Sequence, residues 1–239
     1  MGMRARAADG MSEIHPLDRP VWSALSTRQA NRAVGDARAL RFATEYGPLA
    51  AAADASLESL SALGALVPSE GILVALEAAQ VPAPPGATIV QRAVCNQMTL
   101  ERLTPGVRPA IAIEVLTEAD AAEMLALATL TKPGPFAART HALGDFVGVK
   151  QGGMLVAMAG ERMAPPGFTE VSAVATDPNH RGRGYAGALM SVVAARILAR
   201  GETAFLHVYD DNVRAIALYE TLGFRFRRAV AMTALARAR

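Results

Sequence analysis

The chain has 239 residues, of which 51% are hydrophobic and 19% charged, so it can bury a substantial core. Its formal net charge of +2 is too small to indicate nucleic-acid binding, and no uncharged apolar run approaches the roughly 18 residues that span a bilayer. The single cysteine, Cys95, cannot form an internal disulfide, and the basic N-terminus lacks the apolar segment of a secretory signal. We therefore expect a soluble, cytoplasmic protein that binds neither nucleic acid nor membrane.

The first half of the chain predicts a small α/β unit. Residues 1–20 are expected to be disordered, because they show no apolar periodicity. The elements predicted after them are a short helix at Val21–Asn31, a strand at Ala39–Thr44, a helix within Ser56–Leu66, and strands at Gly71–Glu77 and Thr88–Leu100. This order matches no named motif, and it is compatible with a degenerate half-copy of the domain that follows.

The run Thr104-Pro105-Gly106 predicts a domain boundary. A strand at Ile111–Val115 follows, and Thr117 to Asp120 resembles a capping box that starts a helix ending near Leu130. Pro135 predicts the start of a second short helix, which carries Phe136 and Leu143. Further elements are predicted at Phe146–Lys150 and Met154–Arg162 as a hairpin, Phe168–Thr176 as a strand, Gly184–Arg200 as a helix and Phe205–Val208 as a strand.

A basic, glycine-rich loop lies between the strand that ends at Thr176 and the helix that begins near Gly184. Its residues are Arg181, Gly182, Arg183, Gly184, Tyr185 and Ala186. Where a strand leads through such a loop into a helix, backbone N–H groups meet the positive end of the helix dipole, which suits a phosphate group. The sequence therefore predicts an anion-binding loop.

Two motifs resemble those of the GNAT acetyltransferase superfamily, whose members use acetyl-coenzyme A. The run R-x-x-G-x-A at 181–186 is similar to the superfamily's pyrophosphate-binding signature, and FLHVYDDNVRAIALYETLGF at 205–224 is similar to its fifth strand and following helix. The resemblance covers roughly Ile111 to the C-terminus. It implies an α/β fold with a mixed central β-sheet flanked by helices.

The resemblance also implies which residues bind acetyl-CoA. The backbone of Val174, Ala175 and Thr176 would contact the pantetheine arm, and the loop from Arg181 to Ala186 would bind the diphosphate. Asn212 would hydrogen-bond the cofactor; it is also placed to be a plain N-cap, and both roles can hold together. The side chains of Arg181 and Arg183 are equally compatible with phosphate contacts and with solvent.

Glu170 and Tyr219 are the candidate catalytic residues. Glu170 lies fourteen positions before Gly184, the offset at which histone-type members carry a general base, which would act through a water molecule or directly. The alternative is an exposed carboxylate at a strand end. Tyr219 occupies the helix position where many members place a tyrosine that protonates the departing thiolate, and the alternative is a core tyrosine. A lone histidine in a strand, such as His207, is more often a packed or hydrogen-bonded core residue than a catalyst. No spacing of His, Cys or carboxylates indicates a metal site.

The loop also fits G-x-G-x-x-G from Gly182 to Gly187, with Asp210 about 23 residues further on, as in dinucleotide-binding folds. Five residues separate the strand from the first glycine, and only about 29 follow Asp210, too few to complete a doubly wound sheet. A glycine turn with no ligand is the other alternative. The acetyl-CoA interpretation accounts for more of the sequence than either.

We expect three segments: a disordered stretch at 1–20, an N-terminal α/β subdomain at 21–105 and a GNAT domain at 106–239. The predicted activity is transfer of an acetyl group from acetyl-CoA to a primary amine by direct attack on the thioester. The alternative is a non-catalytic module that binds acyl-CoA. The acceptor, a small molecule or a peptide, and the oligomeric state, with a homodimer among the options, cannot be read from the sequence.

Overall fold

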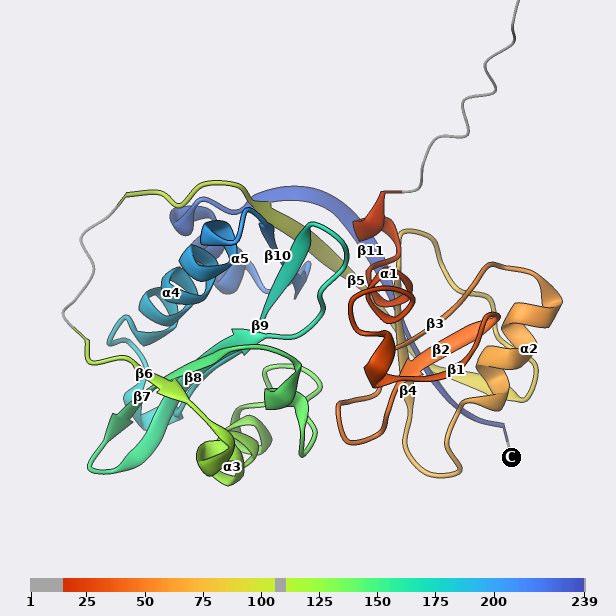
Figure 1. Ribbon diagram of the computed structural model, residues 1–239, viewed down its shortest axis with the longest axis horizontal. Coiled ribbons are helices and arrows are strands. Elements are labelled where there is room, and N and C mark those ends of the chain that lie inside the picture. The colour runs from red at the N-terminus through yellow and green to blue at the C-terminus, as the bar shows by residue number, and fades with distance from the viewer. Residues whose placement is uncertain (1–14, 106–110, 239) are drawn as a thin grey trace, which may run out of the picture.

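A computed structural model describes residues 15–105 and 111–238 (Figure 1). Its centre is an eight-stranded mixed sheet with strand order β4-β11-β5-β10-β9-β8-β7-β6, accompanied by a three-stranded antiparallel sheet, β1-β2-β3. The strands are β1 (Ala33–Asp36), β2 (Ala39–Phe42), β3 (Ala50–Ala52), β4 (Leu73–Glu77), β5 (Ala87–Leu100), β6 (Glu114–Leu116), β7 (Phe146–Gln151), β8 (Met154–Glu161), β9 (Phe168–Thr176), β10 (Thr203–Tyr209) and β11 (Arg225–Arg237).

The α-helices are α1 (Pro20–Leu25), α2 (Leu57–Ala65), α3 (Ala121–Thr131), α4 (Tyr185–Ala199) and α5 (Val213–Leu222). Short 3-10 helices are η1 (Pro16–Asp18), η2 (Ala30–Arg32), η3 (Glu118–Asp120), η4 (Thr140–Leu143) and η5 (Pro178–His180). The mixed central sheet with helices on both faces confirms the predicted fold class. None of the helices in the described part of the chain has the length and apolarity that crossing a membrane requires.

Successive side chains of a strand point to opposite faces, so neighbouring residues belong to different cores. On β10, Leu206 and Val208 pack into a core with α4 and α5, whereas Phe205 joins a core with Leu17 and Val230 on the opposite face. Helix α3 packs on that opposite face as well, over β8 and β9. The N-terminal unit and α3 therefore share one face of the sheet, and α4 and α5 cover the other.

The central sheet runs across the predicted domain boundary. Strand β5, which lies in the first half of the chain, is inserted between β10 and β11, and β4 pairs with the outer side of β11. In Figure 1, β5 and β11 run side by side from the part of the molecule that carries α4 and α5 to the N-terminal unit. The division into domains at residue 105 stays a prediction, but the hydrogen-bonded sheet is continuous over it.

Strands β9 and β10 form a fork, which we define by where their pairing stops. They are hydrogen-bonded in parallel only between Phe168–Glu170 and Thr203–Phe205, although both strands continue beyond these residues. Past this point, the pairing of β9 with β8 shifts register at Ala173, which has a φ of 53°. A bulge bends the strand that carries it, so we attribute the parting of β9 from β10 to this bulge.

Most predicted elements are confirmed, including the capping box formed by Thr117 and Asp120. Three predictions need correction. Residues 15–20 are ordered rather than disordered, because Leu17 is fully buried and fixes η1 in the core, while residues 1–14 lie outside the described range. The helix predicted from Pro135 is replaced by η4, and the strand predicted at Ile111–Val115 begins only at Glu114. Strands β1 and β3 were not predicted, since runs of four and three residues carry little periodic signal.

The burial of Leu17 leads to a stability prediction. Leu17→Ala should lower the free energy of unfolding by about 2–5 kcal/mol, because a fully buried leucine is truncated. Leu57→Ala, which truncates a leucine that is 69% exposed, is the matched control and should change it by less than about 0.5 kcal/mol. Urea unfolding followed by circular dichroism measures both. Equal and small effects would mean that η1 does not belong to the core.

Candidate active site

The candidate site is built where the fork opens beside the start of α4. Gly184 is the residue before α4, no side chain caps the helix, and Gly182 and Gly184 both have a φ of 78°. This left-handed backbone is favourable only for glycine, which explains the two glycines of the loop. The first N–H groups of a helix lack intrahelical acceptors, so α4 presents backbone donors next to the diverging strands.

The structure brings together the residues that were predicted to bind a cofactor through their backbone. Val174 and Thr176 are half-buried on β9 past the end of its pairing with β10, and Ala175 is buried between them. The loop residues Arg181 to Gly184 are exposed. The Tyr185 side chain is an exception, because it packs into the core under α4, so only the backbone of this residue faces the loop.

Helix α5 carries the two remaining predicted residues. The side-chain oxygen of Asn212 accepts a hydrogen bond from the N–H of Ala215 at 3.2 Å, so Asn212 is the N-cap of α5. Tyr219 packs against the core shared with α4, and its ring centroid lies 6.2 Å from that of Phe224. Burial raises the pKa of the Tyr219 hydroxyl, which keeps it protonated and suits a proton donor.

Glu170 lies at the closed end of the fork and is only 1% exposed. Its carboxylate accepts two hydrogen bonds from the guanidinium of Arg162, at 2.8 and 2.9 Å, and a third contact joins it to Nδ1 of His207 at 2.9 Å. Burial alone would raise the pKa of this carboxyl, but the charge of Arg162 and the bonds from Arg162 and His207 outweigh it and lower the pKa to about 2.

These surroundings do not suit the general base that the sequence predicts. A carboxylate with a pKa near 2 has little tendency to take a proton from an ammonium group, and its oxygens are already occupied by Arg162 and His207. The alternative prediction, an exposed carboxylate at a strand end, is wrong, because Glu170 is buried. We propose instead that Glu170 is a charge partner that fixes the closed end of the fork.

Sequence reasoning missed the partners of Glu170. Arg162 and Glu170 face each other because the turn at Pro165-Pro166-Gly167 sets the register in which the Arg162 N–H bonds to the Glu170 carbonyl at 3.2 Å. His207 was assigned as a packed or hydrogen-bonded core residue, which its side chain, 5% exposed and bonded to Glu170 and Gln97, confirms. The hairpin register was the signal that could have identified Arg162.

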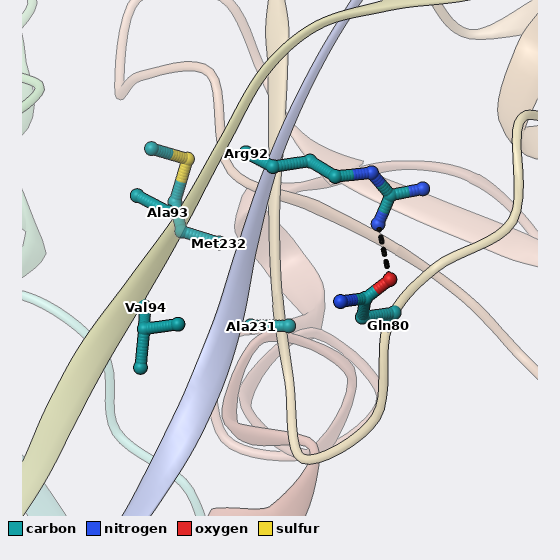
Figure 2. Close-up of a pocket in the computed structure, with 6 residues that line it drawn as sticks. All are labelled: Gln80, Arg92, Ala93, Val94, Ala231 and Met232. Carbon is teal, nitrogen blue, oxygen red and sulfur yellow. Dashed lines mark hydrogen bonds between the residues drawn. The ribbon is translucent and has the colours of Figure 1, made fainter.

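A shallow pocket of about 160 Å³ lies on the long strands β5 and β11 (Figure 2). None of the residues that line it belongs to β9, β10, α4 or α5; they are Gln80, Arg92, Ala93, Val94, Ala231 and Met232. The guanidinium of Arg92 already donates to the side chain of Gln80 at 3.0 Å, as Figure 2 shows, and to the Val81 carbonyl. We therefore place the candidate site at the fork.

Known proteins resemble this chain in sequence and fold. The sequence matches the family described as FR47-like protein over residues 146–232, which span β7 to β11 up to Met232. The N-alpha-acetyltransferase RimI of Mycobacterium tuberculosis is 37% identical over 126 residues, which cover 48% of this chain and 78% of the relative. A crystal structure of a GNAT-family protein from Novosphingobium aromaticivorans is 42% identical, covers 94% of this chain and 100% of its own, and superposes with a TM-score of 0.88.

These similarities identify the class of protein. The chain belongs to the GNAT family of N-acetyltransferases. A GCN5-related N-acetyltransferase from Kribbella flavida, 19% identical, shares the fold over 92% of this chain and 96% of its own with a TM-score of 0.61. Because both solved structures match nearly the whole chain, the N-terminal unit belongs to the shared architecture.

The buried pair of Arg162 and Glu170 leads to a second stability prediction. Glu170→Gln should lower the free energy of unfolding by about 3–5 kcal/mol, because it leaves the guanidinium of Arg162 buried without its counter-charge. Urea unfolding at pH 7 measures this loss. The matched control is Glu101→Gln, which removes the charge of an exposed glutamate and should leave the unfolding curve unchanged.

The same pair makes the stability depend on pH. The folded pKa of Glu170 is lowered from 4.5 to about 2, so its stabilisation is complete above pH 4.5 and is lost as the pH falls from 4.5 towards 2. Glu170→Gln should therefore lose less stability than the parent protein between pH 6 and pH 3. Parallel pH profiles for the two proteins would contradict the assignment.

Proposed function

We propose that the protein transfers an acetyl group from acetyl-CoA to a primary amine, by direct attack of the amine on the thioester. The observation that carries this proposal is the fork that opens beside the uncapped N-terminus of α4. Unpaired backbone groups on β9 are suited to hydrogen-bond an extended pantetheine arm, and the N–H groups of the loop are suited to a diphosphate. Val174, Ala175, Thr176 and the loop from Arg181 to Ala186 would then bind the cofactor, with Asn212 at the start of α5.

We further propose that the acceptor is an α-amine. An amine must be neutral to attack, which at pH 7 costs about 4.6 kcal/mol for a lysine-type amine of pKa ~10.4 but only about 1–1.4 kcal/mol for an α-amine of pKa ~7.7–8.0. Glu170 is committed to Arg162 and offers little basicity, so the site is suited to an amine that needs no strong base. The N-alpha-acetyltransferase activity named for the relative from Mycobacterium tuberculosis agrees with this choice.

Tyr219 would supply the proton in this scheme. Attack of the neutral amine forms the new C–N bond and leaves the nitrogen protonated; this nitrogen loses a proton to solvent as the C–S bond breaks. The departing thiolate of coenzyme A takes its proton from Tyr219, which solvent then reprotonates. A buried tyrosine with a raised pKa is protonated at neutral pH and can donate. The location of the protein in the cytoplasm stays a prediction.

The acceptor class can be tested with two small amines. Alanine amide offers only an α-amine and Nα-acetyl-lysine amide only an ε-amine, and release of free thiol from acetyl-CoA follows the turnover of each. At pH 7 kcat/KM should be higher for alanine amide by about 10²-fold, as the difference in deprotonation cost requires. The gap should narrow from pH 7 to pH 9, because the neutral fraction of the ε-amine keeps rising when that of the α-amine is nearly complete. Equal rates at pH 7 would overturn the α-amine assignment, and no thiol release across a broad panel of amines would overturn acetyl transfer itself.

The role of Tyr219 can be tested separately. Tyr219→Phe should lower kcat by about 10²-fold, because it removes only the proton donor. The affinity for acetyl-CoA, measured by calorimetry, should stay within about 3-fold, since the ring still packs against Phe224. Tyr46→Phe, which removes a hydroxyl that bonds Arg32 in the N-terminal unit, is the matched control and should leave kcat unchanged. A collapse of acetyl-CoA affinity in Tyr219→Phe would mean that the hydroxyl binds the cofactor instead.

A further inference from the structure

A fully buried glutamine connects the closed end of the fork to the N-terminal unit. Gln97 lies on β5 opposite His207 of β10 and is 0% exposed. Its amide meets three polar groups: the Leu17 carbonyl at 2.8 Å, Nε2 of His207 at 3.0 Å and Nη1 of Arg227 at 2.8 Å. A buried amide with this many partners is strongly constrained.

The chemistry of two of these neighbours fixes which way the amide points. The Leu17 carbonyl can only accept a hydrogen bond, so it must meet the NH₂ of Gln97. The guanidinium of Arg227 can only donate, so it must meet the amide oxygen. The reverse orientation would place oxygen against oxygen and N–H against N–H, and the second hydrogen of the NH₂ is therefore left for His207.

The orientation of Gln97 in turn fixes the tautomer of His207. Because the NH₂ of Gln97 donates, Nε2 of His207 must accept and carries no proton. The ring proton then lies on Nδ1, which donates to Oε1 of Glu170 at 2.9 Å. A protonated imidazolium would set two N–H groups against each other at Nε2. Both ring nitrogens of His207 are thus committed.

The hydrogen bonds of Gln97 continue into the N-terminal unit. Leu17 belongs to η1, and the guanidinium of Arg227 also donates to Asp18 of the same helix at 2.7 Å. The connection therefore runs from η1 through Gln97 and His207 to Glu170, where the pairing of β9 and β10 ends. All of these groups face the side of the sheet that the N-terminal unit covers.

We propose that Gln97 is a positioning residue for acetyl transfer. It holds His207 as the Nδ1–H tautomer and so fixes the position of Glu170. It also connects the N-terminal unit to the closed end of the fork through hydrogen bonds. The backbone of β9 and β10 just past Glu170 is where the thioester would lie. A displacement of about 1 Å there is enough to slow a reaction strongly. The activity arm of the test below rests on the proposed acetyl transfer, whereas the tautomer arm does not.

The tautomer arm uses nuclear magnetic resonance of the ¹⁵N-labelled full chain. Long-range ¹H–¹⁵N correlations separate protonated from unprotonated ring nitrogens, and the chain has only four histidines, so His207→Gln identifies the His207 signals by their loss. We expect Nδ1 protonated and Nε2 unprotonated in the parent protein. A protonated Nε2 there would overturn the proposal whether or not the protein has activity. Gln97→Glu places acceptor oxygens against Nε2, and it should move a proton to that nitrogen.

The activity arm compares two buried glutamines. Gln97→Leu removes the bonds to Leu17, His207 and Arg227, and it should lower kcat by about 10-fold or more while the KM for acetyl-CoA stays within about 3-fold. Gln29→Leu is the matched control, because Gln29 is 6% exposed and bonds the backbone of Arg162 and Ala164 but does not touch His207. It should keep the His207 tautomer and a kcat within about 3-fold of the parent.

If Gln97→Leu retains the parent's kcat, or loses no more than Gln29→Leu, Gln97 is structural only and the proposal fails. If Gln97→Leu does not fold, Gln97→Glu and the parent spectrum decide the matter. If the parent protein releases no thiol with any amine, the proposed acetyl transfer is wrong. The His207 spectrum still tests, independently of activity, whether Gln97 sets the His207 tautomer.

Discussion

The parting of β9 from β10 is the constraint on which the rest of the structure depends. In a sheet every strand normally supplies its neighbour's hydrogen bonds, so backbone groups past Glu170 and Phe205 are left for another partner. The bulge at Ala173 bends β9 away, α4 follows β9 after the loop 177–184, and α5 follows β10 after residues 210–212. The candidate site of this protein can thus be understood as one interrupted strand pair with two helix starts beside it.

The closed end of this fork is held by charge rather than by apolar packing alone. A buried arginine and glutamate repay the loss of their hydration only when the geometry is good and the remaining polar atoms are satisfied. Arg162 and Glu170 meet through two hydrogen bonds, one to each carboxylate oxygen, and Nδ1 of His207 makes a further contact with Oε1. The contacts that make Glu170 a poor base also fix the closed end of the fork. The stability of the fold and the preference for an acceptor that needs no strong base therefore have the same origin.

Local sequence was sufficient for the parts of the site that depend on local backbone. The glycines at 182 and 184 need their positive φ angles, Asn212 caps α5, and the strand, loop and helix around them follow from periodicity and turn chemistry. The environment of Glu170 was beyond such reasoning, because its side-chain partners are Arg162, just past the end of β8, and His207 of β10. Gln97 of β5 in turn connects His207 to η1. The spacing of the family's motif identifies Glu170 as the residue at the position of the base. Only the side chains packed around Glu170 determine its pKa and therefore its charge.

The insertion of β5 between β10 and β11 has a consequence for how the molecule is assembled. The middle of the sheet joins segments more than 100 residues apart, as in the pairing of Cys95 with Tyr209 and Val230, and such non-local contacts slow the search for the native topology. Until β11, the last strand, is synthesised, β5 lacks one neighbour and β4 has none in this sheet, and unpaired strand edges invite association between chains. The interval between the synthesis of β5 and that of β11 thus leaves strand edges of the nascent polypeptide unpaired.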